Sequence, residues 1–420
     1  MNKKSDTLDC KYGFRNWNFT ISTIKTYNIM KKFMFTILHG RSPKQYGLNL
    51  ALTVFLISGS IVFTSCEKTP TPTGGDNDEE YSEILASYTN NTVILTYKGM
   101  ADAAMELLAE CKKMTYPIDQ NLVDAACAKW RQARVFWEQS EAFLYGPAEY
   151  HSLDPHLDSW PLDKNQLDQV LGRDDVLEMD AAFVRDNLGV SLLGFHAIEY
   201  VLFRDGNPRE AANITAAELA CLKAITEVLT QDCILLEGSW AGESSLSNEK
   251  ITILEDAELS VTSNFGNEMI NAGKPGSRYS SASQGIEEII EGCKAIADEV
   301  GNAKIADPVE SKNVLDVESW YSWNSIDDFI NNIVSIENSY YGMCGGSIAE
   351  HSLSKLIAEK NSALDSEIKT RIGNAKEKIE AIGRPFRNNL NNNAGTSAAM
   401  DACSELLESL EKIKKELGLE

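Results

Sequence analysis

The residue pair with the clearest chemistry is His196 and Glu199, in the apolar stretch LGVSLLGFHAIEYVLF of residues 188–203. A spacing of three puts both side chains on one face of a helix, close enough to hold one object together. A buried imidazole and a buried carboxylate are costly unless they are hydrogen-bonded, paired or bound to a metal. Because an imidazole with carboxylates suits zinc or iron, the pair is a candidate metal site. An internal hydrogen bond that braces a buried helix is the alternative.

Glu141 is a third candidate ligand. It lies on a helical stripe that is otherwise apolar and is formed by Trp130, Ala133, Trp137, Glu141 and Leu144, at spacings of three or four. Acids are seldom fully buried unless they are paired, so Glu141 needs a partner there. Exposure at a fraying helix end, or a salt bridge to Arg134, explains this residue equally well.

Helical patterns must position these side chains. Residues 121–145 form one predicted helix and residues 181–203 a second, which carries His196 and Glu199. Thr215 opens a third, with Glu218 three residues later in a capping-box pattern. Further helical segments continue to residue 417, and no run of alternating strands interrupts them. We therefore predict an all-α fold of two four-helix-bundle-like domains, residues 81–240 and 241–420, packed together.

The charge is distributed unevenly along the chain. Residues 1–65 hold nine Lys/Arg and two Asp/Glu, whereas residues 66–420 hold 30 basic and 60 acidic side chains. A body this acidic repels nucleic acid and attracts cations. Hydrophobic residues at 43% and charged residues at 24% are typical of a globular protein.

The N-terminal region has the residue pattern of a secretion signal. Basic residues precede the apolar run LNLALTVFLISGSIVF of residues 48–63, which is short for a membrane span. The following Phe63-Thr64-Ser65-Cys66 resembles a bacterial lipoprotein cleavage box, with Phe63 where Leu is usual. We expect residues 1–65 to be the signal region, with translation starting at Met30 or Met34, and Cys66 to be lipidated. Residues 66–80 would be a flexible tether.

Three segments, in order, resemble the imelysin family of bacterial envelope proteins. The first contains Ala133-Arg134, Trp137, Glu141-Ala142-Phe143 and Tyr145-Gly146-Pro147; the second is the Trp-Pro segment DSWPL of residues 158–162; the third is GFHAIE of residues 194–199, which matches the family's Gly-x-His-x-x-Glu signature. IENSYYG of residues 336–342 is a weaker match. The resemblance extends from residue 81 to the C-terminus.

The resemblance implies a pair of four-helix bundles with the signature at their junction. Family members are metallopeptidases or iron-regulated uptake proteins, related to a periplasmic component of iron import. On this basis the expected ligands are His196, Glu199 and Glu141, with Asp158 as a fourth, and iron is expected rather than zinc. The expected location is the cell envelope, through a lipid anchor, at the periplasmic or outer face of the outer membrane. A small ligand or an envelope protein is a further possible partner.

Whether the chain is an enzyme stays open at this point. It has no His-Glu-x-x-His motif, and no second histidine at helical spacing from His196. His151 and His156 lie in a loop outside the matched positions, and we interpret them as exposed. The alternatives to iron binding are a metallopeptidase that uses the same residues and a metal-free module that binds a peptide or a protein partner. Seven cysteines beyond Cys66 are interpreted mostly as small core residues, with a Cys111–Cys127 bridge possible.

Overall fold

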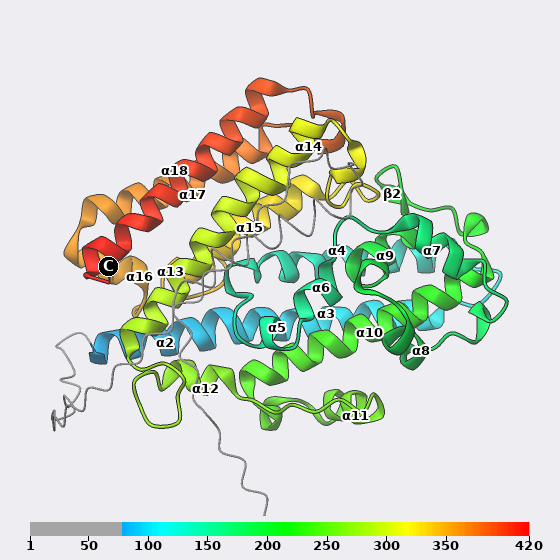
Figure 1. Cartoon of the computed structure of the whole chain (residues 1–420), viewed down its shortest axis with the longest axis horizontal. Helices are drawn as coiled ribbons and strands as arrows, with labels where there is room; N and C mark the ends of the chain where they lie inside the picture. The colour runs from blue at the N-terminus through cyan, green and yellow to red at the C-terminus, as the bar shows by residue number, and fades with distance from the viewer. Residues whose placement is uncertain (1–77, 420) are drawn as a thin grey trace, which may run out of the picture. The chain divides into compact units, whose positions relative to one another are not determined.

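The computed structural model describes residues 78–419, which are helical almost throughout (Figure 1). This confirms the all-α class. Within this range the only strands form a two-residue hairpin, in which β1 (Phe203–Arg204) pairs antiparallel with β2 (Asn207–Pro208). Within the same range, no helix combines the length and the apolar character that a membrane crossing requires.

The signal region and Cys66 lie outside the described residues. Residues 78–80, which we expected in the tether, instead form the first turn of α2 (Asp78–Tyr88). Their three carboxylates interact favourably with the positive end of the helix dipole.

An N-terminal helix group is built around α3 (Ile94–Lys113), which packs against α4 (Gln120–Glu138) and α10 (Ala216–Ala241). The predicted capping box at the start of α10 is confirmed, because the Thr215 and Glu218 side chains each accept the other's backbone N–H. The remaining elements of this group are η1 (Thr89–Val93), η2 (Glu141–Phe143), α5 (Pro147–Tyr150), α6 (Leu153–Asp158), α7 (Lys164–Leu171), η3 (Val176–Glu178), α8 (Ala181–Asn187), η4 (Val190–Leu192), α9 (Gly194–Leu202) and η5 (Ala211–Asn213).

A C-terminal helix group contains α13 (Ala282–Glu299), α15 (Ser325–Tyr341), α17 (Ser362–Glu380) and α18 (Asn393–Leu417), which lie side by side in Figure 1. The other elements after α10 are η6 (Glu243–Ser245), α11 (Asn248–Asp256), α12 (Phe265–Ile270), η7 (Val300–Ile305), α14 (Ala306–Ser311), η8 (Val314–Asp316), α16 (Leu353–Lys360) and η9 (Phe386–Asn388). The two groups meet where α15 packs against α4 and where α13 packs against η2 and α2.

The predicted helix over residues 121–145 extends too far toward the C-terminus. The helix ends at Glu138 and not at residue 145, so Glu141 lies in the short 3₁₀ helix η2. The Ser140 hydroxyl donates to the Trp137 carbonyl, and the Ala142 N–H donates to Ser335 Oγ on α15. These local and long-range bonds replace the next turn of the helix.

The prediction of one helix over residues 181–203 is also wrong. α8 ends at Asn187 and α9 begins at Gly194. Gly194 has a φ of +71°, and a Cβ at this position would lie 2.2 Å from the Leu157 carbonyl oxygen. Glycine is therefore required here, because it lets the end of α6 pack directly on the start of α9. This contact brings Asp158, at the end of α6, to His196.

The described cysteines, Cys111, Cys127, Cys221, Cys233, Cys293, Cys344 and Cys403, are all free thiols. The Cys111–Cys127 bridge is not formed. Both residues are buried in the core, which agrees with their interpretation as small core residues.

We predict that Gly194→Ala lowers the free energy of unfolding by about 2 kcal/mol or more, because it adds both a clash and a strained φ. Urea unfolding followed by circular dichroism measures this loss. Gly189→Ala is the matched control, since Gly189 has a φ of −73° and a Cβ there meets no atom within 4 Å. We expect the control to change stability by less than about 1 kcal/mol. Equal effects of the two substitutions would contradict the assigned role of Gly194.

Candidate metal centre

Arg134 on α4 lies at the centre of a buried polar cluster. Its side chain has no exposed surface, and its guanidinium also lies 5.4 Å from the centre of the Phe195 ring. Four carboxylates surround it: Glu138 one turn later on α4, Asp158 at the end of α6, Glu318 with 2.7 Å between Nη2 and Oε1, and Asp328 on α15 with 3.6 Å between Nε and Oδ1. Arg134 therefore joins residues of both helix groups.

His196 lies beside this cluster with both ring nitrogens facing carboxylates. Its Nδ1 is 3.0 Å from Glu199 Oε2, as the spacing of three predicts, and its Nε2 is 3.0 Å from Asp158 Oδ1. The contact between Nε2 and Asp158 lacks hydrogen-bond geometry, so this fully buried nitrogen has no hydrogen-bond partner. Asp158 is held in place by Arg134 and by the Trp137 indole, whose Nε1 donates to Oδ2 at 2.7 Å.

Glu199 has both of its oxygens occupied. Oε2 faces His196 Nδ1, and Oε1 accepts the backbone N–H and the hydroxyl of Ser322, each at 2.7 Å. This arrangement fixes the orientation of the imidazole, with Nε2 turned toward Asp158. In metal sites such a carboxylate orients the histidine ligand without itself binding the metal.

Glu141 belongs to the other side of the cluster. Its Oε1 is 3.6 Å from Lys304 Nζ, and Lys304 also lies 3.7 Å from Glu138 and 3.2 Å from Glu318. The salt bridge between Glu141 and Arg134, one of our alternatives, is therefore not the observed pairing.

Two groups of three side chains have the spacing of metal ligands. One is formed by Asp158, His196 and Glu318, the other by Glu138, Glu141 and Asp158, and within each group the ligand atoms lie within 4.8 Å of one another. Asp158 is common to both. The structure thus brings His196, Glu199 and Asp158 together, and places Glu141 with Asp158 but not with His196.

Sequence reasoning missed Glu138, Lys304, Glu318 and Asp328 as members of the cluster. Glu138 had a usable signal, because it lies four residues after Arg134 and so on the same helical face. The two loop histidines do not join the cluster: His156 lies 3.5 Å from Asp232 and its side chain is 28% exposed, and His151 is half-buried. Trp320 and Trp323 are half-buried and pack on the Arg387 guanidinium.

Negative charge exceeds positive charge in this buried region. Among the described residues the cluster holds six carboxylates, against the two permanent cations Arg134 and Lys304. Burial raises the pKa of Glu138 to about 8 and that of Asp328 to about 6, although Arg134 opposes both shifts. Burial likewise raises the pKa of Glu141 well above its usual range. Without a further cation, protons must therefore neutralise part of the cluster.

The pKa shifts of Asp158 and His196, unlike those of Glu138, Glu141 and Asp328, favour the charged form of each side chain. Burial alone would raise the pKa of Asp158, but Arg134 and His196 hold it well below its usual range. Burial alone would lower the pKa of His196, but Asp158 and Glu199 raise it to about 9. At neutral pH and without a metal, His196 is therefore in its positively charged imidazolium form.

The residues present fit a metal ion. The buried His196 Nε2 has no hydrogen-bond partner, and the cluster has more carboxylates than cations. One imidazole with several carboxylates suits iron or another hard cation better than thiolate-preferring metals. An ion bound by Asp158 and Glu318 would share both carboxylates with Arg134.

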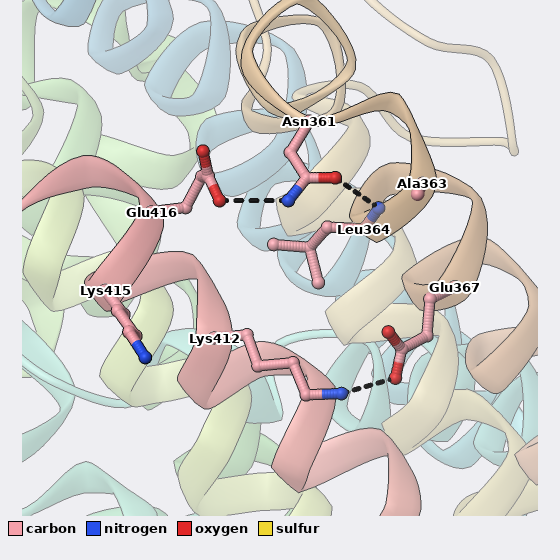
Figure 2. A pocket seen from close by; sticks show the side chains of 7 residues that line it. All are labelled: Asn361, Ala363, Leu364, Glu367, Lys412, Lys415 and Glu416. Carbon is pink, nitrogen blue, oxygen red and sulfur yellow. Dashed lines mark hydrogen bonds and ion pairs between the residues drawn. The ribbon is translucent and has the colours of Figure 1, made fainter.

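A surface groove of about 480 Å³ lies elsewhere, between the start of α17 and the last turns of α18 (Figure 2). Its polar groups largely satisfy one another, since Asn361 Nδ2 donates to Glu416 at 3.0 Å and Lys412 pairs with Glu367 at 2.7 Å. The groove shares no lining residue with the metal centre.

We predict that the stability contributed by His196 in the metal-free protein falls as the pH rises. The pKa of His196 is raised from 6.5 to about 9 on folding, so its contribution is complete below pH 6.5 and is lost as the pH rises through 9. The difference in unfolding free energy between wild type and His196→Gln should shrink over this range by on the order of 3 kcal/mol. Chelator-treated samples unfolded in urea at several pH values measure it. A constant difference would mean that the imidazole is not protonated in the folded chain.

Comparison with known proteins identifies the family. The family model described as imelysin matches residues 93–413. Iron-regulated protein A of Synechococcus elongatus is 27% identical over 324 residues, which are 76% of this chain and 81% of that protein. The solved structure of a candidate iron-regulated protein A precursor from Parabacteroides distasonis is 34% identical, with a TM-score of 0.72 over 83% of this chain and 98% of that chain. An imelysin-like protein from Psychrobacter arcticum is 13% identical, with a TM-score of 0.60 over 81% and 95% of the two chains, and shares the fold. With these matches, and with the signature residues His196 and Glu199 in contact at the junction of two helix groups, the chain belongs to the imelysin family.

Proposed function

We propose that this imelysin-family chain binds one iron ion at the Arg134 cluster and aids iron uptake at the cell envelope. The observation that carries the proposal is the buried His196 Nε2, which faces Asp158 at 3.0 Å without hydrogen-bond geometry in a cluster with surplus carboxylates. Buried charge of this kind requires neutralisation, and a metal cation supplies it in place of protons.

The ligands in this proposal are His196 through Nε2, Asp158 and Glu318. Glu199 is assigned to orientation, because its two oxygens are taken by His196 Nδ1 and by Ser322. Bound iron would supply positive charge to the carboxylates. The protein's own groups hold the ligand set rigid: Trp137 and Arg134 fix Asp158, and Arg134 and Lys304 fix Glu318.

The preference for iron is supported by the donor set and by the relatives. Oxygen donors outnumber nitrogen donors, which favours a hard cation over zinc in a thiolate or multi-histidine site. A triply charged ion would offset more of the carboxylate excess than a doubly charged one. Two of the similar proteins carry the name iron-regulated protein A, which supports a role connected with iron.

A metallopeptidase is the enzymatic alternative that the family resemblance implies, and the geometry favours it less than iron binding. Hydrolysis needs an open metal position and a base within reach of the bound water. His196 and Glu199 have no exposed surface, so a polypeptide has no access to them in this conformation. The peptidase alternative requires cleavage of an unfolded protein that stops with chelator and with Glu199→Gln.

A lipid anchor at Cys66 would hold the metal centre at the envelope, where imported iron arrives. The support is the sequence pattern before Cys66. Acyl chains attach a protein to a membrane through the burial of their own methylene groups.

For the anchor, we predict that Cys66→Ser moves the protein from the membrane fraction to the soluble fraction of the cells that make it, since the serine hydroxyl does not accept the thioether-linked lipid. Fractionation followed by immunoblotting gives the distribution. Cys344→Ser, a change at the half-buried thiol of the described body, is the control and should leave the distribution as in wild type. Equal membrane association of Cys66→Ser and wild type would refute the anchor.

For the metal centre, we predict that the purified chain, stripped with chelator, binds one equivalent of iron. Titration calorimetry with iron(II) without oxygen, iron(III) citrate and zinc(II) measures stoichiometry and affinity. His196→Gln and Glu318→Gln remove ligands and should each weaken iron binding by more than about 100-fold. Glu199→Gln removes only the orienting carboxylate and should weaken it by about 10- to 100-fold while one equivalent still binds.

The control for this titration is His351→Ala, because His351 lies on the surface near Glu83 and should not affect the affinity. Preference for zinc over iron would reopen the peptidase alternative. A folded wild-type chain that binds none of the three ions would refute the proposal, and the cluster would then be a structural charge network.

A further inference from the structure

Lys304 is a buried lysine whose ammonium is enclosed by carboxylates. Its Nζ lies 3.2 Å from Glu318, 3.6 Å from Glu141 and 3.7 Å from Glu138, and its side chain is only 10% exposed. The Lys304 ammonium therefore pairs with three carboxylates at once in this cage.

Lys304 lies in an irregular stretch of helix, which points its side chain toward the three carboxylates. α13 passes into the π-helix η7, which contains Lys304 and leads into α14. η7 packs against α18, and a Cβ on Gly301 would lie 3.0 Å from the Cys403 side chain. Widened turns of this kind are frequent at functional sites, because they redirect one side chain within an otherwise regular helix.

The enclosing carboxylates come from two parts of the chain. Glu138 ends α4, Glu141 begins η2 and Glu318 precedes α15. Two of these, Glu138 and Glu141, also form the second ligand-spaced group with Asp158, all within 4.8 Å of one another. A cage of carboxylate oxygens is the donor set that hard metal cations use, yet here a lysine ammonium neutralises it.

We propose that Lys304 occupies a second cation position of the cluster and thereby limits the chain to one bound metal ion. This inference rests on the proposed function, since it presupposes an ion at His196, Asp158 and Glu318. A second ion held by Glu138, Glu141 and Asp158 would compete with the Lys304 ammonium for two of its three ligands, Glu138 and Glu141, whereas the first ion shares only Glu318 with Lys304. Repulsion between the ammonium and a second ion at this short range, in a buried site, excludes that ion.

Lys304 and Glu141 have distinct roles. Lys304 determines stoichiometry, because its ammonium, which is tethered to the chain, fills the second position. Glu141 would be a ligand only when the ammonium is absent, because its carboxylate is grouped with Glu138 and Asp158 and not with His196. The Gly-x-His-x-x-Glu signature thus serves the first position only.

The test is the iron(II) stoichiometry of the purified chain, measured without oxygen by titration calorimetry and by metal analysis after gel filtration. Wild type is expected to bind one equivalent and Lys304→Met two, since methionine keeps the length of the side chain but removes its charge. Lys304→Arg keeps the cation and should bind one. Lys304→Met combined with Glu141→Gln removes a ligand of the new position and should return to one equivalent.

Each outcome separates the two proposals. Wild type without bound iron refutes the proposed function. One equivalent for both wild type and Lys304→Met, or two equivalents for wild type, overturns the role of Lys304 and leaves the first site intact. If metal-free Lys304→Met does not fold, iron(II) should restore its helical circular dichroism spectrum, because the second ion replaces the missing charge. A variant that stays unfolded at saturating iron(II) also overturns the inference.

Discussion

The buried guanidinium of Arg134 is the interaction on which the site and the junction of the two helix groups both depend. Taking a charge of this kind out of water costs several kcal/mol, and the cost is offset only where carboxylates surround it with good geometry. Glu138 and Asp158 come from the N-terminal helix group, and Glu318 and Asp328 come from the chain that follows α14. Removing one partner would leave an uncompensated buried charge, so the cluster specifies how α4, α6 and α15 meet.

The same charges that specify the junction create the surplus that favours a cation. Arg134 and Lys304 cannot neutralise all six carboxylates, and the pKa of Glu138, raised to about 8 by burial, places a proton on that carboxyl at neutral pH. A protonated acid and a protonated imidazole are the resting forms of the centre at neutral pH. Cation binding is then an exchange of these protons for a metal ion, so its affinity should be coupled to pH.

The sequence predicted the parts of the site that depend on short spacing. Three residues separate His196 from Glu199, and a helix converts this directly into contact. Glu318 and Lys304 could not be predicted, because each meets Arg134 or Glu138 across more than 160 positions of chain and only the packing of α13 and α15 on α4 brings them there. The break before α9 was missed for another reason: the apolar run is continuous, and only the close approach of Leu157 to Gly194 requires the turn.

The segment of residues 317–324 connects the centre to the outer shell of the protein. Glu318 and Ser322 face inward to Arg134 and Glu199, whereas Trp320 stacks under the Arg387 guanidinium, 4.6 Å from the ring centre, and Tyr321 lies under Arg204. Ser319 and Trp323 have positive φ values of 51° and 59°. This backbone conformation costs on the order of 1 kcal/mol or more for each residue. The outer cation–π contacts hold this strained segment in place. The geometry around His196 is therefore set by groups that never touch it, which explains why its ligand-binding properties cannot be read from the signature residues alone.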